Sequence, residues 1–211
     1  MYIDVWSDVV CPWCYIGKRR LETALGEFEH AADVELRWHS FQLDASHPKG
    51  RREPVRDMLA KKTGAPPEQV EAMTGQVTEL AAAEGLTYDL RNAVAVNTLD
   101  AYRPNHLADR HGLGGPMHER LLKAHLCDAE VLDDLETLVR LGAEVGVPED
   151  EAREVLEGTK YADEVDADFA EARRIGVNGV PFFVLNGTHG VSGAQSPVTF
   201  LSALEKAHQS R

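Results

Sequence analysis

The sequence predicts an α/β fold in which a small mixed β-sheet is interrupted by a large all-helical insertion. Alternating apolar residues indicate strands at Tyr2–Trp6 and Val34–Leu43, and strand patterns return only after Gly176. Nearly everything between Pro54 and Gly176 is helix-forming, with breaks at glycine and proline clusters. We therefore expect a discontinuous domain of residues 1–50 and 161–211 and an inserted helical domain of residues 51–160.

The first helix should begin directly after the first strand. Pro12 has the fixed backbone angle favoured at the first helical position, so Cys11 should lie at or beside the N-cap. A right-handed crossover would then bring this helix onto one face of the sheet before the chain enters its second strand. Within the insertion, Pro104 should kink or break the helix expected over Asn97–Arg110, close to Arg103.

The end of the chain carries a turn signal and a cap signal. Asn186-Gly187 separates the apolar run Val180–Leu185 from a strand expected over Thr188–Ser192, which predicts a β-hairpin. Ser196 can cap a last helix that begins at Pro197.

The composition excludes some classes of partner. The 35 acidic and 22 basic side chains give a formal charge of -13, which works against binding to nucleic acid or anionic lipid. The chain opens Met1-Tyr2-Ile3-Asp4, without a basic start or an apolar run of signal length, and no later segment is long enough to span a bilayer. We expect a cytoplasmic protein with no nucleic-acid or membrane partner. The oligomeric state stays open, with a homodimer among the alternatives.

Two of the three cysteines are spaced for chemistry. Three cysteines in 211 residues do not make a disulfide scaffold, so Cys11 and Cys14 indicate redox exchange or metal binding. Their spacing is one helical turn, so both sulfurs can lie on one side of the helix start. A thiolate there meets unpaired backbone N–H groups and the positive end of the helix dipole. We predict that Cys11 is the exposed, attacking sulfur and that Cys14 is the more buried, resolving thiol.

The rival use of the pair is half of a zinc site. Such a site needs four ligands, and no second CxxC or HxxxH accompanies the pair, although Cys127 and nine histidines leave a scattered site open. We predict no metal and no bound cofactor.

Cys127 lies in an apolar helical stripe and should be buried and inert. His39 should be a hydrogen-bonded structural residue, Asp8 a solvated carboxylate, and the carboxylates of Glu149–Glu171 a solvated helix face.

Three segments carry a resemblance to a known family. Ser7–Gly17, with the sequence SDVVCPWCYIG, resembles the active-site strand and helix of the DsbA-like thioredoxin-fold oxidoreductases, especially the FrnE-type subfamily. Asn178–Val184 is similar to the Gly-Val-Pro segment of that family, and Ser192–Gln195 resembles the loop that follows. The resemblance implies a thioredoxin-like fold with a large all-helical insertion. It also implies dithiol–disulfide exchange with protein or small-molecule thiols and disulfides, with glutathione among the candidate thiol substrates.

The resemblance also assigns a role to Pro181. In the family, this proline follows a cis peptide bond and faces the CxxC. Proline lacks an N–H and takes the cis form at modest cost, so Pro181 can present the Val180 backbone to an extended peptide while crowding out metal ions. A trans proline at the start of an edge strand is the alternative. Val180 and Pro181, with Pro12 and Trp13 between the cysteines, form the expected substrate-binding set.

We expect the protein to be a thiol–disulfide oxidoreductase. It should act as a reductase or isomerase, because an oxidase is harder to sustain in a reducing cytosol. Two alternatives remain. Glutathione-dependent isomerases and kappa-type transferases share the architecture, but they typically carry serine in place of Cys11 and an acidic group in place of Ala194-Gln195. The other is a non-catalytic, chaperone-like binding module with an apolar groove around Trp13, Pro181 and Phe182.

Overall fold

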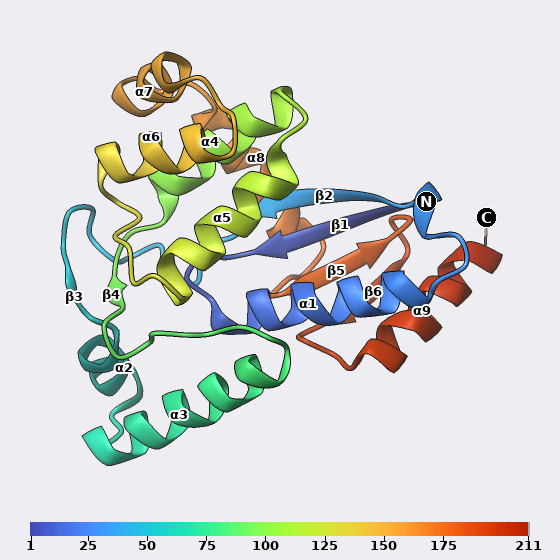
Figure 1. Cartoon of the computed structure of the whole chain (residues 1–211), viewed down its shortest axis with the longest axis horizontal. Coiled ribbons are helices and arrows are strands. Elements are labelled where there is room, and N and C mark those ends of the chain that lie inside the picture. Colours follow the sequence, from blue (N-terminus) through green and yellow to red (C-terminus); the bar gives the residue numbers. More distant parts are fainter. Residues whose placement is uncertain (211) are drawn as a thin grey trace.

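Four strands form one mixed sheet in the order β2-β1-β5-β6 (Figure 1). In this computed structural model, which describes residues 1–210, β1 (Tyr2–Ser7) pairs in parallel with β2 (Glu35–Ser40). On its other side, β1 pairs antiparallel with β5 (Phe182–Leu185), and β5 forms a hairpin with β6 (His189–Ser192). β1, from the start of the chain, and β5, from its end, are therefore neighbours at the centre of the sheet.

Helices make up most of the rest of the described chain. Their bounds are α1 (Pro12–Glu27), α2 (Val55–Thr63), α3 (Pro67–Ala83), α4 (Leu99–Arg110), α5 (Gly114–Leu126), α6 (Leu135–Glu144), α7 (Glu149–Glu157), α8 (Ala162–Arg174) and α9 (Pro197–Gln209), with a 3-10 turn at Ala31–Asp33. A two-residue pair, β3 (Glu53–Pro54) with β4 (Val94–Ala95), connects the ends of the α2–α3 segment. The sequence showed no signal for this pair, since two residues are too few for a strand pattern to be read.

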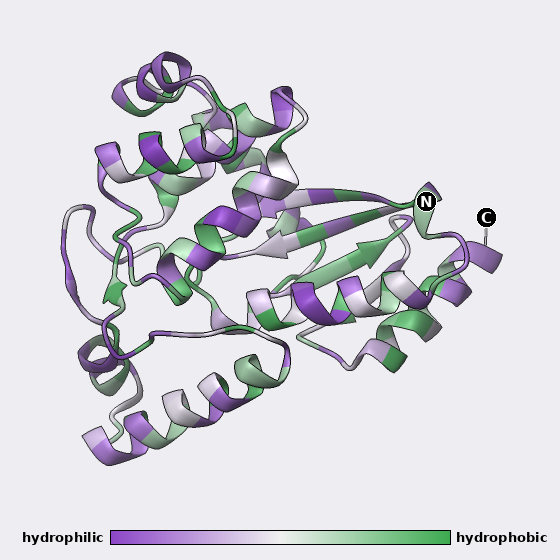
Figure 2. Cartoon of the chain, viewed as in Figure 1, coloured by the Kyte–Doolittle hydropathy of each residue, from purple (hydrophilic) through white to green (hydrophobic). Residues whose placement is uncertain are grey.

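The sheet is covered on both faces by helices. Ile3 and Val5 of β1 and Phe183 of β5 pack with Leu21 of α1 and Phe200 of α9, in one apolar core. On the other face, Trp6 packs against the end of α8 and the segment that follows it. In Figure 2, β5 is green along its length, whereas β1 and β2 alternate between apolar and polar residues. Because α1 is fixed on the sheet along its length, its N-terminus is held at the end where β1 finishes (Figure 1).

The helices inserted between β2 and α8 form two groups. Helices α4 to α7 share an apolar core that includes Leu107, Met117, Leu121 and Leu138. Helices α2 and α3 pack on each other and lie apart from that group, near the start of α1 (Figure 1). An α/β fold with a large helical insertion is thus confirmed, whereas the proposed domain boundaries at residues 51 and 160 stay a prediction.

Local signals at the chain end are confirmed, and one expectation within the insertion is wrong. Asn186 and Gly187 both have positive φ angles, 50° and 70°, and Thr188 N–H closes the turn to Leu185 O at 3.1 Å. Ser196 Oγ accepts from Thr199 N–H at the start of α9. Pro104 was expected to kink or break the helix, and the break is not found, since α4 continues from Leu99 to Arg110, while the kink stays a prediction. Proline removes one helical N–H, and the burial of α4 among its neighbours outweighs that loss.

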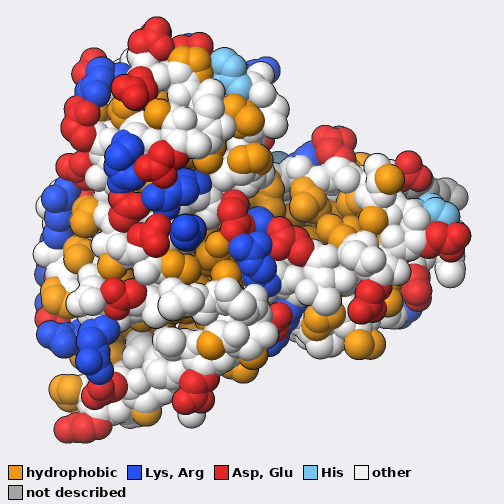
Figure 3. Space-filling view, viewed as in Figure 1, with side chains coloured by type: hydrophobic (Ala, Val, Ile, Leu, Met, Phe, Trp, Pro, Cys, Tyr) orange, Lys and Arg blue, Asp and Glu red, His pale blue; other side chains and the backbone are white. Residues whose placement is uncertain are grey.

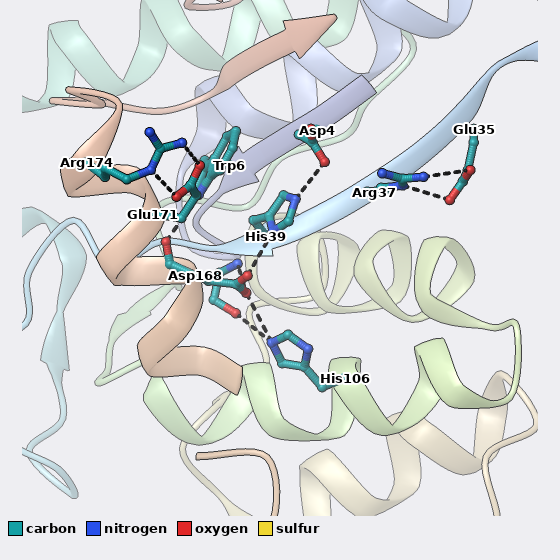
Figure 4. Close-up of polar contacts among 10 residues, drawn as sticks. Asp4, Trp6, Glu35, Arg37, His39, His106, Asp168, Glu171 and Arg174 are labelled. Carbon is teal, nitrogen blue, oxygen red and sulfur yellow. Dashed lines mark hydrogen bonds and ion pairs between the residues drawn. The ribbon is translucent and has the colours of Figure 1, made fainter. Parts of the chain in front are cut away.

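A buried carboxylate connects the sheet to two helices (Figure 4). Asp168 of α8 lies 2.8 Å from His39 Nδ1 on β2 and 3.1 Å from His106 Nε2 on α4. It also accepts the Ser40 backbone N–H at 2.7 Å. His39 bonds Asp4 with its other nitrogen and stacks on Trp6, so its structural role is confirmed. Asp168, in contrast, is an exception to the solvated face expected for the acidic segment.

Asp168 and His39 contribute to stability in opposite directions of pH. Burial would raise the pKa of Asp168, but hydrogen bonds from His106 and His39 outweigh it and hold that pKa well below 3.8. Burial would lower the pKa of His39, but Asp168 and Asp4 outweigh it and raise that pKa above 6.5. The contribution of Asp168 to stability is therefore present above about pH 4 and lost in stronger acid. That of His39 is present below about pH 6.5 and lost as the pH rises through its raised pKa.

We expect Asp168→Asn to lower the free energy of unfolding by about 3 kcal/mol, because it removes the buried carboxylate that His39 and His106 both contact. The variant should also lose less stability than the wild type between pH 6 and pH 8, as measured by urea denaturation. Glu171→Gln is the matched control, since Glu171 lies on the same helix and its pair with Arg174 is exposed, so that solvent screens it and its loss should leave stability nearly unchanged. Equal losses in the two variants would contradict this account.

Candidate active site

The first turn of α1 places the two cysteines at the end of the sheet where β1 finishes. Cys11 is the N-cap residue, with φ -85° and ψ 115°, and Pro12 follows as the first helical residue. Cys11 N–H donates to Asp8 O at 2.9 Å, and Cys14 N–H donates to Cys11 O at 3.0 Å. The N-cap position predicted for Cys11 is confirmed.

The two sulfurs differ in their surroundings rather than in their exposure. Cys11 is 3% exposed and Cys14 2%, so the expectation of an exposed Cys11 is wrong, because the helical insertion covers this end of α1. Cys11 borders a cavity, and its Sγ points to Val180 O at 3.7 Å. Cys14 faces the interior. Burial raises the pKa of its thiol well above 9.0 and the Cys11 thiol raises it further, while the Ser7 hydroxyl and the Asp8 N–H oppose this.

The predicted proline segment lies directly opposite Cys11. The Val180–Pro181 peptide bond is cis, as the sequence resemblance implied. Val180 is half-buried and Pro181 is buried, and Pro181 O accepts from Gly193 N–H at 2.8 Å. The structure therefore brings Cys11, Val180 and Pro181 together from the two ends of the chain, and their role in substrate binding stays a prediction.

A glycine allows α1 to lie against this proline. A Cβ atom on Gly17 would be 2.9 Å from Pro181 Cγ and 3.4 Å from Phe183 Cζ. Contacts below about 3 Å force a neighbour to move, and Pro181 is held by its own backbone hydrogen bond. Residue 17 must therefore be glycine for the helix to approach this closely, a requirement that only the folded chain makes visible.

A cavity of about 450 Å³ opens beside Cys11, Pro12 and Trp13. Its walls are mainly apolar and come from α2, α3 and the loops around them. The apolar lining residues are Val10, Leu43, Val55, Met58, Leu59, Met73, Val77, Leu90, Ala95 and Val96. Trp13 is 40% exposed at this position. Figure 3 shows acidic and basic side chains spread over the outer surface of the helices, with hydrophobic side chains gathered in the hollow between the helical part and the sheet. This size and lining suit an apolar ligand group.

Asp8 is buried beneath the cavity and is not the solvated carboxylate that we expected. It accepts from Tyr102 Oη at 2.7 Å and from Leu43 N–H at 2.8 Å. Burial raises its pKa, while these hydrogen bonds oppose the change. Tyr102 belongs to α4, which is far away in the sequence, so the residues around Asp8 carried no sign of this burial.

Cys127 lies apart from the pair. It is half-buried at the end of α5 and borders a second cavity of about 420 Å³ with Tyr15, Arg19 and Lys123. It is thus less buried than expected. Burial raises the pKa of its thiol, so Cys127 is a neutral group at pH 7. Tyr88 was not singled out in the sequence, but its hydroxyl donates to Pro12 O at 2.6 Å. This hydrogen bond holds the first turn of α1 in place.

Comparisons with known proteins agree with this arrangement. Residues 2–205 match the family model of the DSBA-like thioredoxin domain. The crystal structure of a probable DsbA oxidoreductase from Streptomyces coelicolor is 41% identical, with a TM-score of 0.97, over 100% of this chain and 91% of that chain. The uncharacterized protein YwbO of Bacillus subtilis (strain 168) is 27% identical over 97% of this chain and 96% of its own length. The cytosolic disulfide reductase DsbM from Pseudomonas aeruginosa shares the fold at 21% identity, with a TM-score of 0.64 over 100% of both chains.

Over residues 1–210, none of the helices combines the length and the apolar character needed to cross a bilayer. Nor do these residues bring three or more His, Cys, Asp or Glu side chains together in a cluster that could hold a metal ion.

We expect Gly17→Ala to lower the free energy of unfolding by about 1–3 kcal/mol, because the added methyl group forces α1 away from Pro181. Gly26→Ala on the same helix is the control. Its Cβ would meet nothing within 4 Å, so it should be stabilising by about 0.5–1 kcal/mol. Urea denaturation of both variants measures the difference, and a stabilising Gly17→Ala would show that the helix can move freely here.

Proposed function

Because the chain belongs to the family of DsbA-like thioredoxin domains, we propose that it is a disulfide reductase or isomerase that works through Cys11 and Cys14. This is a family of thiol–disulfide oxidoreductases. The observation that carries the proposal is the position of Cys11, at the N-terminus of α1 and facing both Val180 and the cavity. Assignment to the FrnE-type subfamily stays a prediction.

The proposed reaction has two exchange steps. The Cys11 thiolate attacks one sulfur of a substrate disulfide, forms a mixed disulfide and releases the other substrate sulfur as a thiolate. Cys14 then loses its proton and attacks Cys11 Sγ, which breaks the mixed disulfide and releases the second substrate thiol. Two electrons have passed to the substrate, and an external thiol must reduce the Cys11–Cys14 disulfide before the next turnover. An isomerase would use the first step and its reversal.

The cavity favours apolar substrates over glutathione. Among its described lining residues, Lys62 alone carries a fixed positive charge, and Asp44 lies 3.4 Å from it. Glutathione has two carboxylates, which basic side chains would have to balance. We therefore propose that the main substrates are disulfides of extended peptides or small molecules with apolar groups next to the sulfur, and that glutathione acts as a reducing thiol. The proposal includes a cytoplasmic location, where such thiols are kept reduced.

The residues near Cys11 also distinguish this proposal from the two alternative functions, a glutathione-dependent enzyme and a chaperone-like module. A glutathione-dependent isomerase or kappa-type transferase would need an anchor for the glutathione amine near Ala194-Gln195. There, Ala194 O accepts from Arg20, and Gln195 Nε2 donates to Ser192 O. A chaperone-like module would use the apolar cavity and Trp13, and would bind unfolded chains equally well after both cysteines are replaced.

We expect Cys11→Ser to abolish the acceleration that the protein gives to insulin reduction by dithiothreitol, because the attacking sulfur is gone. Cys14→Ser should accumulate mixed disulfides with its substrates, visible on non-reducing gels, because nothing resolves them. Cys127→Ser is the control and should retain wild-type turnover, since Cys127 lies at a separate cavity. Wild-type turnover of both the Cys11 and the Cys14 variants would refute the assignment.

We also expect iodoacetamide at pH 6 to label Cys11 roughly tenfold or more faster than Cys14, as read by fragment mass spectrometry. Cys11 borders the cavity, whereas burial raises the pKa of the Cys14 thiol. Cys127 supplies an internal comparison, because its pKa is also raised by burial. Equal labelling of Cys11 and Cys14 would contradict the division of roles.

A further inference from the structure

A buried serine hydroxyl and a buried histidine lie together at the end of β1, on the face of the sheet that α1 covers. Ser7 is the last residue of β1, and strand alternation places it on the same face as Ile3 and Val5, which is the face that α1 covers. From there its hydroxyl opposes the rise that burial causes in the pKa of the Cys14 thiol. Ser7 Oγ lies 3.0 Å from Nε2 of His118 on α5. Ser7 and His118 are 1% and 3% exposed, so water does not compete for these contacts. Nothing in the reaction described above uses either residue.

His118 is held in one position and is neutral at pH 7. Its ring stacks on Trp38 at 4.1 Å between centroids. Burial lowers its pKa to about 3, Lys18 contributes in the same direction, and Glu119 opposes them. Lys18 is itself paired with Glu22 and Glu119. A neutral imidazole has one N–H, so His118 either donates to Ser7 or accepts from it.

We propose that the Ser7 hydroxyl stabilises the Cys14 thiolate in the resolving step, and that His118 directs this hydroxyl by donating its Nε2–H to Ser7 Oγ. Ser7 would then be a catalytic residue and His118 a positioning residue. The inference rests on the proposed function, because it concerns the second of the two exchange steps. When Nε2–H occupies a lone pair of Ser7 Oγ, the hydroxyl hydrogen is free to point at the sulfur.

The proton balance needs no further group. Cys14 S–H gives up its proton as Cys14 Sγ attacks Cys11 Sγ, and the departing substrate thiolate takes that proton. Ser7 keeps its own hydrogen and donates a hydrogen bond to the charged sulfur, an interaction about twice as strong as one between neutral groups. Without it, a sulfur this deeply buried would form its anion only at a considerably higher pH.

Other polar groups near Cys14 are already engaged. The Asp8 carboxylate accepts from Tyr102 and Leu43, and it is the Asp8 backbone N–H that faces the sulfur. Tyr88 donates its hydroxyl to Pro12 O. Ser7 is therefore the side chain placed to answer a change of charge on Cys14.

The test separates the two exchange steps in a single turnover. In a Cys127→Ser background, the reduced protein is mixed with 5,5′-dithiobis(2-nitrobenzoate). The first thionitrobenzoate is released by Cys11 and the second by Cys14. We expect Ser7→Ala to leave the first release unchanged, to slow the second about 10-fold, and to shift its pH profile upward.

Ser40→Ala is the matched control. Ser40 pairs in register with Ser7 on the neighbouring strand, is 5% exposed, and has its own histidine, with Oγ 3.3 Å from His106 Nε2. Both releases should keep wild-type rates in this variant. An unchanged second release in Ser7→Ala, or an equal slowing in Ser40→Ala, would overturn the role of Ser7. Absence of the first release in the unaltered dithiol would instead refute the proposed function.

Two substitutions test the positioning role of His118. His118→Phe keeps a ring that can stack on Trp38 but has no donor, so the second release should be slow and its pH profile shifted. His118→Gln offers an amide N–H to Ser7 and should restore part of the rate. Wild-type rates and pH dependence in His118→Phe would show that Ser7 needs no such partner. Circular dichroism checks that each variant is folded.

Discussion

The contact between the start of α1 and the cis Val180–Pro181 segment is the interaction on which the site depends. Antiparallel pairing of β1 with β5 produces it, because Trp6 lies opposite Phe182. The residues that follow Trp6 and those that precede Phe182 must then meet at the same end of the sheet. The sulfur at the N-cap of α1 and the Val180 carbonyl are brought together by strand register, and Gly17 removes the one side chain that would hold them apart.

Features decided by neighbouring residues could be predicted from the sequence. The N-cap position of Cys11, the Asn186-Gly187 turn and the Ser196 cap each depend on a few adjacent residues, and each is present. Features decided by distant packing could not. Pro104 was expected to break α4 because an isolated helix would break there, but burial against neighbouring helices keeps α4 whole.

The same distinction applies to the site. The cysteine pair and Pro181 carry signals of their own, since a CxxC and a Val-Pro pair have few other uses in such positions. Ser7 and His118 are ordinary residue types 111 positions apart, and only the packing of α5 against the end of β1 joins them. The burial of Cys11 was missed for a related reason, because the local pattern describes the helix N-terminus and not the helices that cover it.

Because both sulfurs are buried, solvent exposure does not explain why Cys11 and Cys14 should react differently. The difference lies in the cavity, which borders Cys11 and does not border Cys14. In the function we propose, a substrate disulfide would reach Cys11 through this cavity, and the α2–α3 segment of the insertion would set the size and polarity of what is accepted. The two sulfurs also have different neighbours, since Cys11 lies at the N-terminus of α1, whereas Cys14 is enclosed by groups of the protein interior.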